Sequence, residues 1–145
     1  MPVIDESIVI NKPRAEVYAF AADSTHLLDW SSNIIEFEAT PPGPVQADTT
    51  AKGVTRVAGR NVEWTSKVTE VEDGVGYTYE SVESPMAFTY SYRFEDAEGG
   101  TKVMFHQDVP TIGGFFGKLA DPIVTRMYSR NVSANLANLK ELLEA

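Results

Sequence analysis

The chain has 145 residues, of which 43% are hydrophobic and 23% are charged, an ordinary composition for a soluble globular protein. Its 12 basic and 21 acidic residues give a net charge of −9, which argues against nucleic acid or an anionic membrane surface as a partner. The absence of cysteine excludes disulfides, thiolate chemistry and cysteine-ligated metal. We therefore expect a single domain over residues 1–145, long enough to bury a core.

The sequence shows no secretory signal pattern, and no apolar segment is long enough to span a bilayer. We therefore expect a cytoplasmic protein without stable insertion into a membrane. Whether the protein forms a homodimer is left open by the sequence.

The first predicted elements are a strand, two short helices and a second strand. Residues 3–10 are rich in β-branched side chains, which favour a strand. A proline suits the start of a helix over residues 13–22, and a brief second helix should cover residues 25–30. Asp23 lies between the two helices and can cap the second. Residues 33–40 form the next predicted strand.

Five further strands with short connections follow. We predict them over residues 49–57, 61–72, 75–83, 86–95 and 101–109. The last two alternate cleanly between inward and outward positions, which is typical of strands with one buried and one wet face. Consecutive strands joined by such short turns form an antiparallel meander.

The only long helical pattern covers residues 111–145 and changes its apolar face along its length. The first apolar stripe consists of Phe115, Phe116, Leu119, Ile123 and Met127. The second consists of Val124, Tyr128, Val132, Leu136, Leu139, Leu142 and Leu143. The change lies at Asp121-Pro122, where Asp121 would act as a cap and Pro122 would kink or restart the helix. We predict an α+β fold in which a curved antiparallel sheet of about seven strands wraps around a long kinked C-terminal helix, with two short helices between strands 1 and 2.

Four segments of the sequence resemble one known family. They are IVINKPRAEVY at residues 8–18 (followed by Asp23 and Trp30), FTYSYRFE at 88–95, GGTKV at 99–103 and NLANLKELLE at 135–144. In these segments the chain resembles the polyketide cyclase/dehydrase and lipid-transport family of the START-like superfamily, also called Bet v 1-like or SRPBCC. The resemblance implies the helix-grip fold, with a deep apolar cavity between sheet and terminal helix that accepts hydrophobic small molecules. It implies no shared catalytic residue.

Large aromatic side chains gather on positions expected to face inward. Buried tyrosine hydroxyls need hydrogen-bond partners, which a cavity holding water or a ligand would supply. The competing interpretation is that these residues are ordinary core aromatics. Gln107 is the most suggestive residue because a buried amide is costly unless paired, so it either orients a ligand or bonds a neighbouring tyrosine. The candidate cavity residues are Trp30, Trp64, Tyr79, Phe88, Tyr90, Tyr92, Phe105, Gln107, Phe115, Phe116, Leu119, Ile123 and Met127.

Three other motifs carry no predicted chemistry. His26 lies near two aspartates, of which Asp23 is better explained as a helix cap. His106 falls on the wet face of its strand beside Asp108. Residues 113–118 are rich in glycine, but they lack the spacing of a phosphate-binding loop. We therefore expect no metal site and no cofactor.

The predicted function is binding of a hydrophobic small molecule, such as a lipid, sterol or polyketide-like compound, in the internal cavity. The alternative is an enzyme, a polyketide aromatase/cyclase or dehydratase, which needs a shaped pocket and donors that polarise carbonyl groups of a bound intermediate. The side chains that could serve such an enzyme are Tyr79, Tyr90, Tyr92, Arg56 and Gln107. A protein-interaction module is a third interpretation, favoured only by Phe115 and Phe116.

Overall fold

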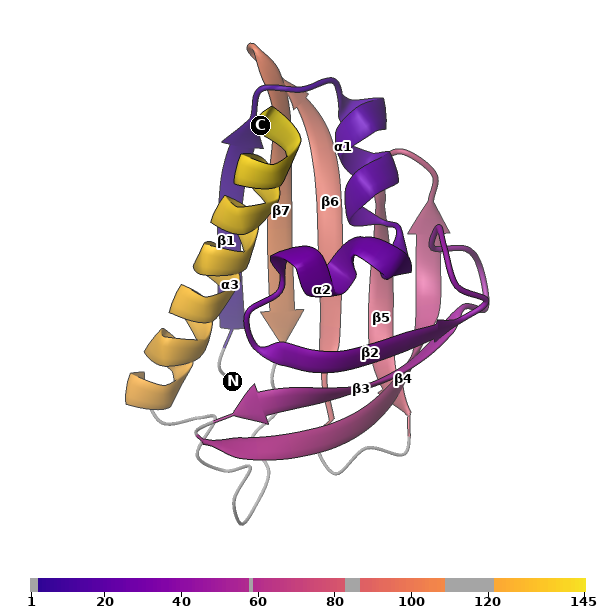
Figure 1. Cartoon of the computed structure of the whole chain (residues 1–145), viewed down its shortest axis with the longest axis vertical. Helices are drawn as coiled ribbons and strands as arrows, with labels where there is room; N and C mark the ends of the chain where they lie inside the picture. Colours follow the sequence, from indigo (N-terminus) through magenta and orange to yellow (C-terminus); the bar gives the residue numbers. More distant parts are fainter. Residues whose placement is uncertain (1–2, 58, 83–86, 109–121) are drawn as a thin grey trace.

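A seven-stranded antiparallel sheet forms most of the fold (Figure 1). The protein is described by a computed structural model that covers residues 3–57, 59–82, 87–108 and 122–145. The strands are β1 (Val3–Ile10), β2 (Ile34–Thr40), β3 (Thr50–Val57), β4 (Arg60–Glu72), β5 (Gly76–Val82), β6 (Thr89–Ala97) and β7 (Gly100–Asp108). Their order in the sheet is β1-β7-β6-β5-β4-β3-β2, so the first strand lies beside the last. The predicted antiparallel sheet is confirmed.

The helices lie on one face of this sheet. They are α1 (Arg14–Ala21), η1 (Ser24–His26), α2 (Leu27–Trp30) and α3 (Pro122–Glu144). Figure 1 shows α1 and α2 in front of the sheet and α3 alongside β1, which is the predicted helix-grip arrangement. The side chain of Asp23 accepts a hydrogen bond from the backbone N–H of Thr25 at 2.9 Å, so the predicted cap is confirmed. Among the described residues, no helix is both long and apolar enough to cross a membrane.

Alternation along β7 defines an inner and an outer face of the sheet. Phe105 and Gln107 are buried, whereas His106 between them is exposed. The register places Tyr92 opposite Phe105 and Tyr90 opposite Gln107 on β6. Because residues directly opposite one another in an antiparallel pair point to the same face, these four side chains share the inner face.

The sheet bends sharply at β2, β3 and β4, which cross the lower ends of the other strands (Figure 1). The register shifts after Val68 in β4 and after Ile34 in β2. Such irregularities bend a strand and increase its twist. Gly53 on β3 allows the ring of Trp64 to approach the backbone, since a Cβ at this position would lie 2.6 Å from the ring Cζ2. The bend gives the inner face a concave shape.

The buried stripe of α3 packs against β1 and α2. Val132, Leu136 and Leu139 are buried and lie three or four residues apart, as predicted. Met127 and Leu142, which we expected on apolar faces, are instead 53% and 44% exposed. Successive helix residues are rotated by about 100°, so these two side chains point away from the stripe of their neighbours.

Pro122 is the first residue of α3, where its missing amide donor costs least. The predicted kink or restart also involves the residues before the proline, which lie outside the described residues. Three candidate cavity residues, Phe115, Phe116 and Leu119, fall within residues 109–121 and lie outside the described residues. The backbone of Ile123 belongs to α3, but its side chain also lies outside the described part.

Candidate functional site

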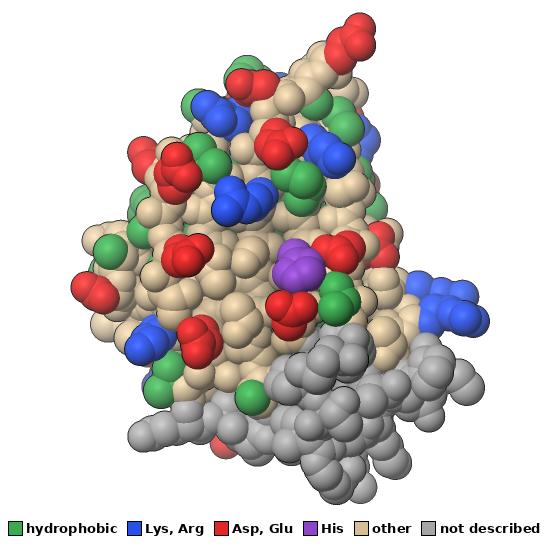
Figure 2. Space-filling model, turned by 180° about the vertical axis from the view of Figure 1, so that it is seen from behind, with side chains coloured by type: hydrophobic (Ala, Val, Ile, Leu, Met, Phe, Trp, Pro, Cys, Tyr) green, Lys and Arg blue, Asp and Glu red, His purple; other side chains and the backbone are tan. Residues whose placement is uncertain are grey.

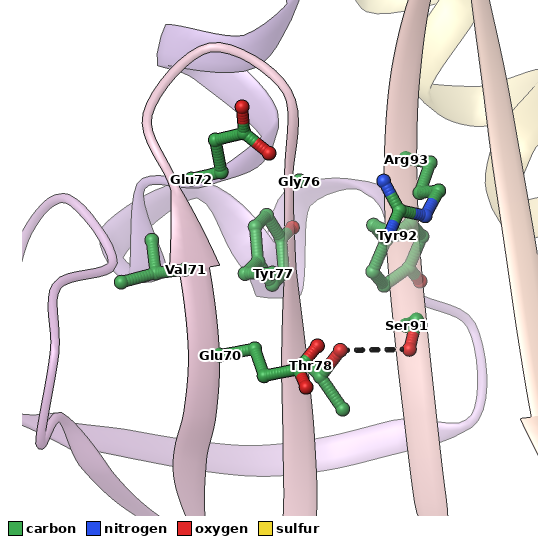
Figure 3. A pocket seen from close by; sticks show the side chains of 9 residues that line it. All are labelled: Glu70, Val71, Glu72, Gly76, Tyr77, Thr78, Ser91, Tyr92 and Arg93. Carbon is green, nitrogen blue, oxygen red and sulfur yellow. Dashed lines mark hydrogen bonds between the residues drawn. The ribbon is translucent and has the colours of Figure 1, made fainter.

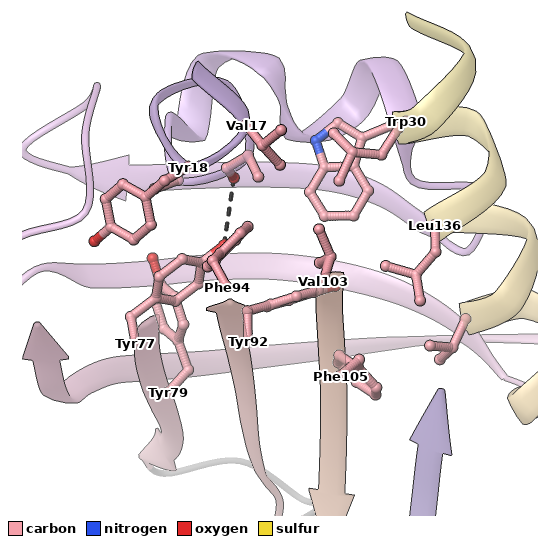
Figure 4. Close-up of a cluster of buried hydrophobic side chains, with 14 of the residues drawn as sticks. Val17, Tyr18, Trp30, Tyr77, Tyr79, Tyr92, Phe94, Val103, Phe105 and Leu136 are labelled. Carbon is pink, nitrogen blue, oxygen red and sulfur yellow. Dashed lines mark hydrogen bonds between the residues drawn. The ribbon is translucent and has the colours of Figure 1, made fainter. Parts of the chain in front are cut away.

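The inner face of the sheet carries a connected cluster of aromatic side chains (Figure 4). The ring centroid of Tyr90 lies 5.3 Å from that of Tyr79, 5.9 Å from that of Phe105, and 6.0 Å from those of Phe88 and Tyr92. Ring separations of roughly 4.5–7 Å are those of favourable stacked or edge-on aromatic pairs. We call this cluster, together with Trp30 and Trp64, the aromatic wall.

The two tryptophans extend the aromatic wall. Trp30 comes from α2 and makes an edge-on contact with Tyr92, at a centroid distance of 5.8 Å. Trp64 comes from β4, and its ring centroid lies 5.7 Å from that of Phe88. Its indole N–H donates a hydrogen bond to the hydroxyl of Thr55 at 2.7 Å. The predicted cavity residues of α2, of the strands and of the segment before β6 thus lie on the inner face. Their contact with a ligand remains a prediction.

Burial keeps the tyrosines of the aromatic wall uncharged. It raises the pKa of Tyr79 to about 12 and the pKa of Tyr90 and Tyr92 well above the ordinary value. The cause is desolvation, which disfavours the phenolate form. At neutral pH all three hydroxyls are therefore protonated, so they can donate hydrogen bonds but cannot act as bases.

A chain of buried polar side chains connects the sheet to α3. Burial raises the pKa of Tyr128 on α3, and hydrogen bonds from the side chains of Gln107 and Asn33 oppose this rise. Asn135 Nδ2 donates to Asn33 Oδ1 at 3.0 Å. Asn135 Oδ1 accepts hydrogen bonds from the backbone N–H and the hydroxyl of Ser32, both at 2.7 Å. This polar chain joins β7, α3 and the α2–β2 connection.

One end of the polar chain is unsatisfied. Gln107 is only 2% exposed, and its Oε1 has no hydrogen-bond partner among the described residues. Leaving a buried acceptor unpaired costs about 1–3 kcal/mol, so native proteins seldom do so without a reason. The oxygen is therefore a buried acceptor for which the described residues supply no donor.

Asn33 and Asn135 were not predicted as site residues, and Tyr128 was assigned only to an apolar stripe. For Asn135, the sequence pattern did indicate a buried polar side chain. Asn135 lies between Val132 and Leu139 on the apolar stripe of α3, and polar side chains in such positions are usually hydrogen-bonded. The partner residues could not be read in this way, because they lie about a hundred residues away in the chain.

Several residues that the sequence analysis considered lie away from the aromatic wall. Arg56, a candidate for the enzyme alternative whose facing the sequence left open, is exposed, because its neighbour Thr55 takes the inward position on β3. Met127 is also exposed, on the solvent side of α3. The ring of His26 stacks on that of Phe20 at a centroid distance of 4.4 Å, outside the inner face.

The outer face of the sheet carries charged side chains of both signs (Figure 2). Nδ1 of His106 lies 2.5 Å from Asp5 Oδ1, and its Nε2 lies 3.2 Å from Asp108 Oδ1. The hydrogen bond with Asp5 is the main cause of a raised pKa of His106. In the part of the chain that the structure describes, no group of three histidine, aspartate or glutamate side chains is arranged to hold a metal ion.

A polar hollow of about 210 Å³ lies over β4, β5 and β6 (Figure 3). Its lining includes Glu70, Glu72, Thr78, Ser91 and Arg93. The hydroxyls of Thr78 and Ser91 are 2.9 Å apart. Charged and hydroxyl side chains of the outer face surround this hollow, whereas ligand sites for apolar molecules are lined mainly by hydrophobic and aromatic groups. The aromatic wall on the opposite face of the same strands is the better candidate site.

Comparison with known families decides the classification. The family described as polyketide cyclase / dehydrase and lipid transport matches residues 1–144. The chain belongs to this family. A comparison with curated protein sequences finds no match.

Solved structures show the fold of the polyketide cyclase/dehydrase and lipid-transport family throughout the chain. The protein TTHA0849 from Thermus thermophilus is 22% identical, with a TM-score of 0.83 over 98% of this chain and 97% of that one. The Zhui aromatase/cyclase from Streptomyces sp. R1128 is 17% identical, with a TM-score of 0.80 over 98% and 93%. Ara h 8.0201 is 12% identical, with a TM-score of 0.68 over 97% and 96%. At these identities the likeness establishes the fold.

Proposed function

We propose that this protein binds a hydrophobic small molecule, such as a lipid, a sterol or a polyketide-like compound, between the inner face of its sheet and α3. The observation that carries this proposal is the aromatic wall, which is continuous from Trp30 on α2 to Trp64 on β4. Sites for small ligands are concave and mostly apolar, with a few placed polar groups that fix orientation. The bent sheet supplies the concave surface, and Gln107 with the tyrosine hydroxyls supplies the polar groups.

A second candidate function is an aromatase/cyclase or dehydratase reaction on a bound polyketide intermediate. It is favoured by the protonated hydroxyls of Tyr79, Tyr90 and Tyr92, which can donate hydrogen bonds to a carbonyl group and stabilise an enolate. The similarity to the Zhui aromatase/cyclase supports the same candidate. Arg56, the only charged side chain considered for this reaction, lies on the outer face, so the remaining candidate donors are all uncharged.

The test of binding uses the purified full-length protein. Native mass spectrometry should detect a co-purifying ligand, and Nile red should bind with saturable one-site behaviour. Tyr90→Phe should change the Nile red affinity by about 2- to 10-fold, the effect of one hydrogen bond. Thr89→Val is the matched control, because it removes one hydroxyl from the adjacent residue, whose side chain points to the outer face. If no ligand co-purifies and Nile red does not saturate, the proposal is wrong.

A separate assay distinguishes the two candidate functions. A linear poly-β-ketone thioester should be consumed faster than in buffer alone, with a faster rise of aromatic absorbance, only if the protein catalyses cyclisation and loss of water. Under that candidate, Tyr90→Phe should slow the reaction, while Thr89→Val should not. If the protein binds Nile red but the thioester is consumed at its uncatalysed rate, the function is binding rather than catalysis.

A further inference from the structure

We propose that the ligand is an uncharged molecule with a hydroxyl group, which donates a hydrogen bond to Oε1 of Gln107, and that this contact selects among hydrophobic ligands. The inference rests on the proposed binding function and adds the chemical class of the ligand. It is carried by three features of the inner face, namely an unpaired buried acceptor, a fixed orientation of its amide, and the absence of a nearby cation from the described residues.

The first feature is the position of the unpaired oxygen. Gln107 lies on β7 between Ile4 of β1 and Tyr90 of β6, which are its register partners. Its side chain is almost fully buried, and Oε1 has no partner among the described residues. The amide is therefore embedded next to the aromatic wall, where an unpaired acceptor lowers the stability of the folded protein. A ligand that supplies the donor removes this penalty when it binds.

The second feature is the fixed orientation of the amide. Hydrogen bonding with the side chains of Gln107 and Asn33 lowers the pKa of Tyr128 against the effect of burial, which is the effect of an amide N–H that donates to the tyrosine oxygen. Asn33 is held in turn by Asn135, whose Nδ2 donates to Asn33 Oδ1 at 3.0 Å. Because the nitrogen of Gln107 is used in this polar chain, its oxygen is the atom left for the ligand. At this one atom the site accepts a hydrogen bond, so a ligand group placed beside Gln107 is favoured if it is a hydroxyl rather than an ether or a ketone.

The third feature is the charge of the surroundings. Among the residues whose side chains the structure describes, no lysine or arginine is buried. The tyrosines of the aromatic wall are protonated at neutral pH even at their ordinary pKa, and burial raises that pKa further. A buried carboxylate would thus find no counter-charge beside Gln107, and its desolvation would oppose binding. An uncharged hydroxyl fits the site, whereas the headgroup of a fatty acid does not.

Three ligands on one ring system test this inference. They are 2-naphthol, 2-methoxynaphthalene and 2-naphthoate, titrated against the full-length protein by isothermal calorimetry. We expect 2-naphthol to bind about 3- to 10-fold more tightly than the ether, the effect of one net hydrogen bond, and 2-naphthoate to bind most weakly. Gln107→Met should abolish the preference for 2-naphthol, so that the ratio of its affinity to that of the ether falls to about 1.

Matched variants separate the contact from general effects of substitution. Gln46→Met is the control, since it makes the same change at the exposed glutamine of the loop before β3. Tyr128→Phe should reduce the preference for 2-naphthol because Gln107 loses the group that orients its amide. If Gln107→Met does not fold, Gln107→Asn serves in its place, because it keeps the amide but withdraws it by one methylene. Equal affinity of a folded variant and the parent for the ether shows that the binding site is intact.

The outcomes distinguish the inference from the function on which it rests. If none of the three compounds binds saturably, the proposed binding function fails and the inference fails with it. If they bind with equal affinity, or if Gln107→Met and Gln107→Asn keep the preference for 2-naphthol, binding stands and the inference is wrong. Tighter binding of the ether or of 2-naphthoate than of 2-naphthol would also overturn it, because the free atom would then be a donor or the site would hold a counter-charge.

Discussion

Truncation of Leu139 to alanine tests the role of α3 as a core element. Leu139 is fully buried, with 0% of its surface exposed. The change removes three carbon atoms, which at about 0.8 kcal/mol for each buried methylene amounts to roughly 2.4 kcal/mol of lost transfer free energy. The cavity left behind adds to this, so we expect the free energy of unfolding to fall by about 3–4 kcal/mol, within the usual range for such changes. For a chain of this length the melting temperature should fall by about 10 °C.

Urea unfolding followed by circular dichroism measures this loss. Leu142→Ala is the control, because it makes the same chemical change on the same helix at a side chain that is 44% exposed. The control should lose less than about 1 kcal/mol, since much of that side chain remains in water in the folded state. If Leu139→Ala and Leu142→Ala both unfold within about 0.5 kcal/mol of the parent, α3 does not anchor the core and the reasoning is wrong.

Two further predictions concern the sheet. Gly53→Ala should destabilise the protein by about 1–3 kcal/mol and change its tryptophan fluorescence, because the new Cβ would lie 2.6 Å from Cζ2 of Trp64; an unchanged urea midpoint would contradict this. The raised pKa of His106 means that its pairing with Asp5 stabilises the fold fully below the unfolded-state pKa of about 6.5, and that this contribution is lost as the pH rises through the folded-state pKa. Asp5→Ala should therefore lower the pKa of His106 in an NMR titration, and a pKa that stays raised would show that Asp5 is not the cause.

Local patterns predicted the secondary structure because each depends on neighbouring residues alone. The alternation around Phe105 and Gln107 gave the inner face of β7, since successive side chains in a strand point to opposite faces. Asp23 was recognised as a cap because the carboxylate of an aspartate can accept a hydrogen bond from a backbone N–H a few residues later in the chain. The helical spacing of apolar residues likewise predicted the helix to which α3 belongs.

The candidate site was predicted only in part because its contacts join distant elements. Two roles were open for Gln107, orienting a ligand or bonding a tyrosine. The lowering effect of Gln107 on the pKa of a tyrosine agrees with the second role, while Oε1 of Gln107 has no partner among the described residues. That tyrosine is Tyr128 of α3, and periodicity cannot show which residue of a helix meets which strand. Met127 illustrates the same limit, since its spacing fits the apolar residues before Pro122, but the packing of α3 turns it to solvent.

The sheet order has a consequence for how the chain reaches its native state. Among the described strands, β1 pairs only with β7, from Val3 beside Asp108 to Ile10 beside Thr101. During synthesis the hairpins from β2 to β7 can form one after another. In contrast, β1 cannot pair until β7, which ends at Asp108, has been made. Closing so long a loop costs conformational entropy before stabilising contacts between β1 and β7 form. This slows folding relative to helical proteins of similar size. Until then the nascent chain exposes the apolar side of β1, which makes this strand the natural place for a chaperone to bind.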